Sequence, residues 1–336
     1  MPSRRHVLLI AALFAFAVTA MPQPDRLNIP IVASYQIKVA DSVLQVDFAD
    51  GPLDLPKDVL LAHIQAAASA VATYYGRFPV PRARLLLIPV PGRHGILQGT
   101  TWGDMHGFPG FTRIRMGEHT NAADLAADWT TTHELVHMAF PSLPDDGNGI
   151  DQHWMEEGLA TYIEPIARVM TGELAAQKIW SDMVRDMPKG EPGPGDQGLD
   201  HTHTWGRTYW GGALFCLVAD VEIRRETQNR KGLQDALRAI VAAGGAIDQD
   251  WDLPRTLAIG DQATGTHVLT NQYNEWKDKP VTVDLPRLWS ELGVTPGPDG
   301  IRFASNAPLA NVREAITKPE GPVIPAALIN RKEQGP

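Results

Sequence analysis

Two histidines four residues apart constrain the fold and the chemistry of this 336-residue chain more than any other feature. His133 and His137 flank Glu134 in the order His-Glu-Leu-Val-His. On a helix, residues i and i+4 share one face, so both imidazoles can reach the same metal ion. Glu134 lies on the flank of that face, where it can take a proton from a water at the metal but cannot reach the metal itself. The spacing therefore predicts a zinc site with a general base.

The residues around this motif are largely apolar and predict a buried helix. They include Ala126, Ala127, Trp129, Leu135, Val136, Met138 and Phe140. Two histidines and a glutamate in a buried helix are costly without a partner such as a metal ion, which favours the zinc site. Histidines on the surface of an amphipathic helix are the alternative interpretation.

A catalytic zinc ion needs a third protein ligand and one open position. Glu156 and Glu157 follow the second histidine after a segment rich in Pro, Asp, Asn and Gly, which predicts a loop. Two helices joined by such a loop can bring a carboxylate opposite the two histidines. The spacing alone leaves both glutamates open as the third ligand.

The stretch that contains these glutamates reads Trp154-Met-Glu-Glu157-Gly-Leu-Ala-Thr-Tyr162. It resembles the Trp-x-x-Glu-Gly-x-x-x-Tyr second zinc helix of the gluzincin metallopeptidases, in particular the glycyl aminopeptidase family and, more distantly, the aminopeptidase N family. The local match implies that Glu157 binds zinc, whereas the usual aminopeptidase spacing of eighteen intervening residues implies Glu156. We favour Glu157, because loops absorb a change of one residue easily.

The resemblance extends to two further residues. It implies that Glu164, two helical turns after Glu157, orients a ligand histidine. From its spacing alone, an exposed helix carboxylate is an equally good interpretation. The stretch that begins at Tyr209 matches the Tyr-x-x-Gly-x-Leu element of the same families, in which the Tyr hydroxyl donates to the oxyanion of the tetrahedral intermediate. Taken alone, Tyr209 can also be a core aromatic residue at a helix start.

One segment departs from the aminopeptidase N pattern. Residues 92–117 are rich in glycine and are placed to form the edge strand that pairs with a substrate backbone; a surface hairpin with a flexible loop is the alternative. Relatives of aminopeptidase N carry a Gly-x-Met-Glu-Asn motif whose Glu holds the free amine of the substrate. Residues 92–117 contain no Glu. The choice between an aminopeptidase and an endopeptidase therefore stays open.

The predicted fold class is α+β, a thermolysin-like gluzincin core in which a small mixed β-sheet lobe precedes a mainly helical lobe. Apolar periodicity predicts a pair of strands in residues 28–50, a helix over 56–76 and a buried strand over 84–91. Further helices are predicted over 174–187, 216–225, 231–243, 253–260, 266–276 and 285–292 and near 310–316. The expected divisions are a signal peptide (1–20), a catalytic zinc-binding domain (28–198), a helical subdomain carrying Tyr209 (199–318) and an extended C-terminal tail (319–336).

The first twenty residues have the pattern of a secretory signal peptide. Arg4 and Arg5 precede an apolar run, and cleavage is expected after Ala20. This predicts a secreted or periplasmic protein with no stable membrane insertion after cleavage. The run is short for a bilayer span of roughly 20 residues, although a retained anchor stays open. Without the two arginines, 28 basic residues face 39 acidic ones, which argues against nucleic acid as a partner.

These features predict a zinc-dependent peptidase that holds one Zn²⁺ ion through His133, His137 and Glu157. Glu134 is its general base, Tyr209 stabilises the oxyanion, and the partner is a peptide or protein substrate. The sequence does not predict side-chain preference or oligomeric state. A catalytically silent zinc-fold protein that binds peptides or a protein partner is the alternative. Retention of the base and the tyrosine argues against it, because binding needs neither.

Overall fold

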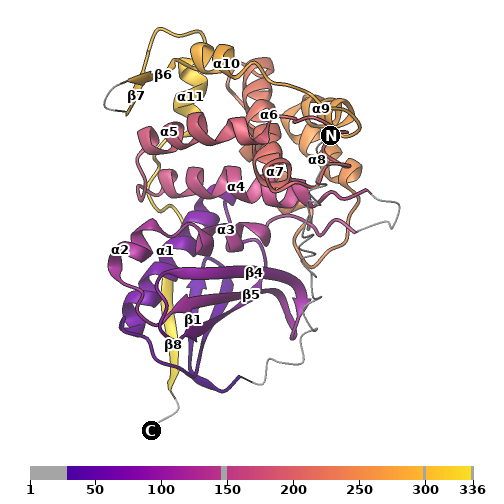
Figure 1. The fold of residues 1–336 in the computed structure, drawn as a ribbon. Helices are drawn as coiled ribbons and strands as arrows, with labels where there is room; N and C mark the ends of the chain where they lie inside the picture. Colours follow the sequence, from indigo (N-terminus) through magenta and orange to yellow (C-terminus); the bar gives the residue numbers. More distant parts are fainter. Residues whose placement is uncertain (1–28, 145–149, 298–299, 334–336) are drawn as a thin grey trace, which may run out of the picture. The chain divides into compact units, whose positions relative to one another are not determined.

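The described residues form a six-stranded mixed sheet, five of whose strands precede a mainly helical region (Figure 1). This computed structural model describes residues 29–144, 150–297 and 300–333; the predicted signal peptide lies outside them. The strands are β1 (Ile31–Val39), β2 (Ser42–Ala49), β3 (Arg82–Val90), β4 (Ile96–Met105), β5 (Phe108–Gly117) and β8 (Ala326–Glu333). Their order is β4-β5-β3-β2-β1-β8. β3 runs parallel to β2 and β5, and the other neighbours are antiparallel. The predicted α+β class, with a mixed sheet ahead of a helical region, is confirmed.

Helix α1 (Lys57–Tyr75) connects the parallel strands β2 and β3, and it confirms the helix predicted over residues 56–76. Parallel neighbours need such a crossover, since a tight turn cannot join them. The helix ends at Gly76, which has a left-handed φ of 75° that favours glycine. α1 contacts strands β1 and β8 as well as helices α3 and α4, so it joins the sheet to the helical region.

The apolar segment around the two histidines forms two short helices. α2 (Ala122–Ala127) ends before Asp128, and α3 (Thr130–His137) begins after it. The Asp128 carboxylate accepts hydrogen bonds from the backbone N–H groups of Thr130 and Thr131 at 2.8 and 3.2 Å. These donors have no partner within the helix, so the carboxylate stabilises the start of α3.

Helix α4 (His153–Met170) is the second predicted zinc helix, and most of its residues are buried. It crosses the start of α6 (Gly212–Glu226) at Gly158, where an added Cβ would lie 2.3 Å from the backbone of Gly212. Only glycine allows so close an approach. The crossing holds the π-helical segment η2 (Gly206–Gly211), which precedes α6, against α4.

The helices predicted beyond α4 are present, with boundaries that shift by a few residues. They are α5 (Ala176–Asp186), α7 (Leu233–Ala242), α8 (Leu253–Thr264), α9 (Val268–Trp276), α10 (Leu285–Leu292) and α11 (Ala310–Ile316), together with the short 3-10 segment η1 (Met187–Gly190) and the hairpin β6 (Val294–Gly297) and β7 (Gly300–Phe303). Within the described residues, no helix is long and apolar enough to cross a membrane.

The end of the chain returns to the sheet, which the sequence did not predict. β8 pairs antiparallel with β1, and Figure 1 shows the yellow strand beside the indigo one. β8 is therefore one edge of the sheet and β4 is the other. The edge at β4 faces α3, where the two predicted histidine ligands lie.

Candidate active site

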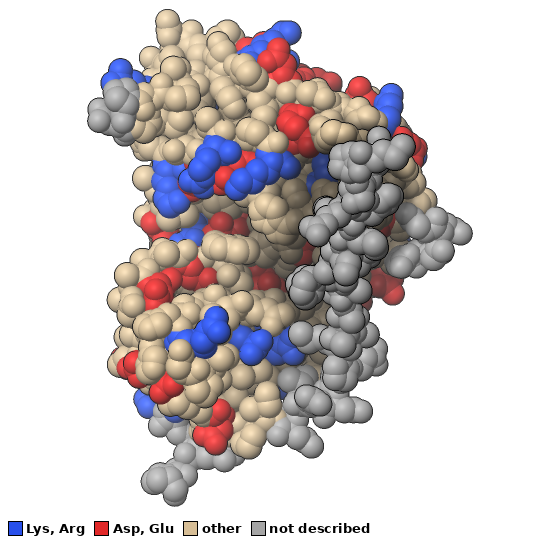
Figure 2. Space-filling model, in the orientation of Figure 1, with Lys and Arg blue, Asp and Glu red and all other residues tan. Residues whose placement is uncertain are grey.

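Two neighbouring cavities border the two predicted zinc helices. The larger, of about 740 Å³, is lined by β4, by the two predicted zinc helices and by Tyr209. We call it the cleft. The smaller, of about 360 Å³, shares Trp129, His133 and Tyr209 with the cleft and extends toward α5. Figure 2 shows the surface hollowed between the level of β4 and that of α5.

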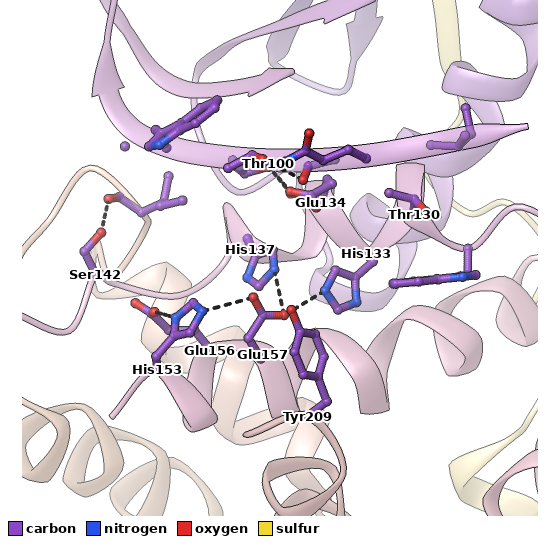
Figure 3. Close-up of a pocket in the computed structure, with 18 of the residues that line it drawn as sticks. Thr100, Thr130, His133, Glu134, His137, Ser142, His153, Glu156, Glu157 and Tyr209 are labelled. Carbon is purple, nitrogen blue, oxygen red and sulfur yellow. Dashed lines mark hydrogen bonds and ion pairs between the residues drawn. The ribbon is translucent and has the colours of Figure 1, made fainter. Parts of the chain in front are cut away.

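Three of the predicted residues converge in the cleft. The Nε2 atoms of His133 and His137 lie 3.0 and 3.6 Å from one oxygen of Glu157, Oε2. Ligand atoms from these three residues all lie within 4.8 Å of one another. Figure 3 shows the two imidazoles turned toward this carboxylate, with Tyr209 beside it. The structure thus brings together the histidine pair of α3 and a glutamate of α4.

These three residues fit a zinc ion in chemistry and in spacing. Imidazole nitrogen and carboxylate oxygen are common zinc ligands, and bonds of 2.0–2.2 Å in a tetrahedron place neighbouring ligand atoms roughly 3.3–3.6 Å apart. The two distances to Glu157 Oε2 lie close to this spacing. Burial lowers the pKa of His133, which favours the neutral imidazole that a metal requires. A His-His-Glu triad consistent with one zinc site is therefore present.

Glu156, the other candidate ligand, lies on a different side of α4. One of its oxygens accepts a hydrogen bond from the backbone N–H of Leu143 at 3.0 Å, and the other lies 2.9 Å from Nδ1 of His153. Successive residues on a helix point about 100° apart, so Glu156 and Glu157 cannot both face the histidines. Glu157 is therefore the glutamate that faces the two histidines, and Glu156 lies beside it.

His153 joins the two glutamates, and sequence reasoning missed it. Its Nδ1 contacts Glu156, and its Nε2 lies 3.2 Å from Oε1 of Glu157, the oxygen turned away from the two histidines (Figure 3). Hydrogen bonds to Glu156 and Glu157 raise the pKa of His153 to about 10. Both ring nitrogens then carry protons at neutral pH and donate to carboxylates. A histidine one residue before the Trp-x-x-Glu-Gly stretch was the only signal available in the sequence.

The predicted general base, Glu134, is held by the edge strand β4. The hydroxyl of Thr101 lies 2.7 Å from Oε2 of Glu134, and the hydroxyl of Thr112 on β5 lies 2.9 Å from Thr101. Gly99, also on β4, packs against the same carboxylate: an added Cβ would lie 2.4 Å from Cγ of Glu134. A side chain at this position would displace that carboxylate. Neither β4 residue was predicted to touch it.

Tyr209 lies on η2 at the rim of the cleft. Its ring stacks on that of Trp205, with 5.8 Å between the centroids, and lies 6.4 Å from the ring of His133. Burial, with the nearby carboxylate of Glu157, raises the pKa of Tyr209 to about 12. The hydroxyl therefore keeps its proton at neutral pH and remains a hydrogen-bond donor. Short π-helical segments such as η2 are frequent at functional sites.

Glu164 is buried on α4, and its carboxylate pairs with Arg168 at 2.7 Å. Burial raises the pKa of Glu164 to about 7. Nδ1 of His133 has no hydrogen-bond partner among the described residues. The orienting role that the family resemblance implies for Glu164 stays a prediction.

The fold is shared with known structures. An aminopeptidase N family protein from Idiomarina loihiensis matches 82% of this chain with a TM-score of 0.57, at 13% sequence identity. This chain has the fold of that aminopeptidase N family protein. The match covers 52% of that protein, so this chain spans about half of its length. An M1 zinc metallopeptidase from Deinococcus radiodurans matches 77% of this chain and 54% of its own, with a TM-score of 0.48 at 15% identity. No protein-family model and no curated protein sequence matches the chain.

Proposed function

We propose that this protein is a secreted or periplasmic zinc-dependent metallopeptidase of the gluzincin type, close to the glycyl aminopeptidases. The observation that carries the proposal is the convergence of a His-His-Glu triad, a carboxylate base and a tyrosine hydroxyl in one cleft bordered by an edge strand. The proposed location rests on the signal peptide predicted over residues 1–20. Determination of the N-terminal residue of the protein recovered from cells tests that cleavage.

His133, His137 and Glu157 would hold the ion. When bound, zinc acts as a Lewis acid that polarises a substrate carbonyl and lowers the pKa of water from 15.7 toward about 7. Glu134, fixed by Thr101, would take the proton of the attacking water and pass it to the leaving amine. The hydroxyl of Tyr209 would donate to the oxyanion, and loss of one such donor typically costs about 2.7–4 kcal/mol in the transition state.

Strand β4 supports a peptide as the substrate. It is an edge of the sheet, so one side of its backbone has no strand partner in the described structure. An extended peptide can add to such an edge through main-chain hydrogen bonds. Gly99 and Thr101 place this edge directly beside Glu134. The bound peptide backbone would therefore run past the base.

The charged residues that line the cleft also indicate which end of a peptide it would receive. Three glutamates, Glu134, Glu156 and Glu157, line it, and no Lys or Arg is among its described lining residues. A free C-terminal carboxylate would find no Lys or Arg there, and the cationic His153 is already paired with Glu156 and Glu157. This favours an aminopeptidase or an endopeptidase over a carboxypeptidase.

A peptide library with free and blocked amino termini, assayed together with zinc content, tests the proposal. We expect about one zinc per chain and cleavage of at least one class of peptides. Cleavage that requires the free amine indicates an aminopeptidase, and cleavage of both forms indicates an endopeptidase. Stoichiometric zinc with no cleavage of any peptide would contradict the proposal and favour a catalytically silent peptide-binding protein.

His153→Gln is expected to weaken zinc binding about 10- to 100-fold, because partners that hydrogen-bond a metal ligand contribute this much to affinity. Nε2 of His153 holds Oε1 of Glu157 and thereby keeps Oε2 turned toward the histidines. Competition with a chromogenic chelator measures the affinity. His201→Gln is the matched control, since His201 is also partly exposed and paired with a carboxylate, that of Asp278. If both variants bind zinc with equal affinity, His153 does not support the zinc site.

A further inference from the structure

The smaller cavity opens next to the proposed reaction centre. It lies between the α2–α3 junction, α4, α5 and η2, and it shares His133 and Tyr209 with the cleft. Its volume of about 360 Å³ is within the range of small-molecule sites, roughly 300–1,000 Å³. None of the steps assigned to the triad, the base or the tyrosine uses it.

Two exposed tryptophans line the smaller cavity, and one of them, Trp129, also lines the cleft. Trp129 is 53% exposed and Trp205 is 61% exposed, and these are the only aromatic residues among the exposed large apolar side chains of the described chain. Trp129 lies edge-on to the ring of His133 at 5.1 Å, and Trp205 stacks on Tyr209. Exposed apolar side chains gathered beside a cavity are typical of a binding site. We call the cavity with its two tryptophans the Trp129–Trp205 pocket.

The walls of the pocket offer apolar surface and no free charge. Its apolar lining comprises Ala126, Ala127, Leu174, Ile179, Met183, Met187 and Trp210. The charged residues that line it are all paired: Glu164 with Arg168, Lys178 with Asp182, and Arg185 with Asp182 and Asp186. Figure 2 shows basic and acidic side chains alternating along the level of α5. A charged ligand group would find no unpaired partner here, and its desolvation would be costly.

We propose that the Trp129–Trp205 pocket receives a large apolar side chain, aromatic or long aliphatic, from the substrate residue next to the cleaved bond on the Tyr209 side. This rests on the proposed function and names its substrate class. A substrate side chain next to the cleaved bond is within reach of the pocket, because the pocket and the cleft share Trp129, His133 and Tyr209 as lining residues. The two tryptophans would cover its stem while the apolar walls enclose its tip.

Peptides that differ only in one of the two residues flanking the cleaved bond test this preference. At one of these positions, Phe or Leu is expected to give kcat/KM at least about tenfold higher than Gly or Asp, since a pocket discriminates about 10-fold or more per missing methylene. Trp129→Ala and Trp205→Ala should each reduce this ratio severalfold, and the double variant should bring it near one. Ile329→Ala, at an exposed apolar residue on β8, is the control and should leave the ratio unchanged.

A filling variant gives an independent check. Thr161 lines the pocket but not the cleft, so Thr161→Phe should occupy the pocket. Cleavage of peptides with Phe or Leu should fall about tenfold or more, while that of Gly peptides should change little. An equal loss for both classes would contradict the assignment of the side chain to this pocket.

Binding can be measured without turnover. In Glu134→Gln, a peptide carrying p-nitrophenylalanine at the preferred position should quench tryptophan fluorescence, and the Trp129→Ala/Trp205→Ala double substitution should remove most of the quenching. Peptide cleavage with equal kcat/KM for Phe, Leu, Gly and Asp overturns the pocket assignment and leaves the hydrolase intact. Quenching that depends on the two tryptophans, with no cleavage by the wild-type protein, overturns the hydrolase and retains the pocket.

Discussion

Glu134→Gln is expected to keep zinc and to lower kcat for peptide hydrolysis by about 10²–10⁴-fold, the usual contribution of a general base. The amide has nearly the shape of the carboxylate and can still accept a hydrogen bond from Thr101, so the cleft should stay intact. It cannot take a proton from water at neutral pH. Steady-state kinetics on the best library peptide, with zinc content measured on the same samples, gives the comparison.

Glu222→Gln is the matched control, because Glu222 is a partly exposed carboxylate on α6 outside the described lining of the cleft. It should hydrolyse peptides at the wild-type rate. If Glu134→Gln with full zinc also cleaves at the wild-type rate, Glu134 is not the base and the proposed mechanism is wrong.

Removing the metal or a ligand is expected to abolish hydrolysis. Dialysis against a chelator should inactivate the wild-type protein, and added Zn²⁺ should restore it. Zinc at 1,000 times its dissociation constant stabilises the folded state by about 4.1 kcal/mol, so the melting temperature should fall on removal and rise on reloading. His137→Ala should bind little zinc, and added Zn²⁺ should not restore its activity.

The paired variants Glu157→Gln and Glu156→Gln decide which glutamate is the ligand. Oε2 of Glu157 lies near both histidines, whereas Glu156 contacts His153 and the backbone of Leu143. Glu157→Gln should therefore lose zinc, while Glu156→Gln should keep it with reduced affinity. The opposite pattern, measured by metal analysis after gel filtration, would assign the ligand to Glu156.

Local patterns predicted the parts of the site that depend on helix geometry alone. His133 and His137 share a face at any i, i+4 spacing, so their pairing needs no tertiary information. The crossover helix α1 and the helices from α5 to α10 followed from apolar periodicity for the same reason. The α+β class followed from the order of these elements.

Long-range packing decided the rest. Gly99 and Thr101 meet Glu134 because β4 is the sheet edge that faces α3, and β8 pairs with β1 almost three hundred residues earlier in the chain. Local periodicity in the sequence does not predict such pairings, since the partner of a strand depends on the whole sheet.

The sequence by itself determined that His133 and His137 share one helix face with Glu134 on its flank, because this follows from residue spacing along one element. It also determined the class of fold, because this follows from the order of the elements. Only the tertiary structure decided that Glu157 faces the histidines, that His153 braces it, and that Trp129 and Trp205 border one pocket. Those contacts depend on how α4 is rotated about its axis and on how α3, α4, α5 and η2 pack together. Rotation by one residue, about 100°, would exchange Glu156 for Glu157 beside the histidines. Residue spacing does not reveal this rotation, although the family resemblance favoured Glu157.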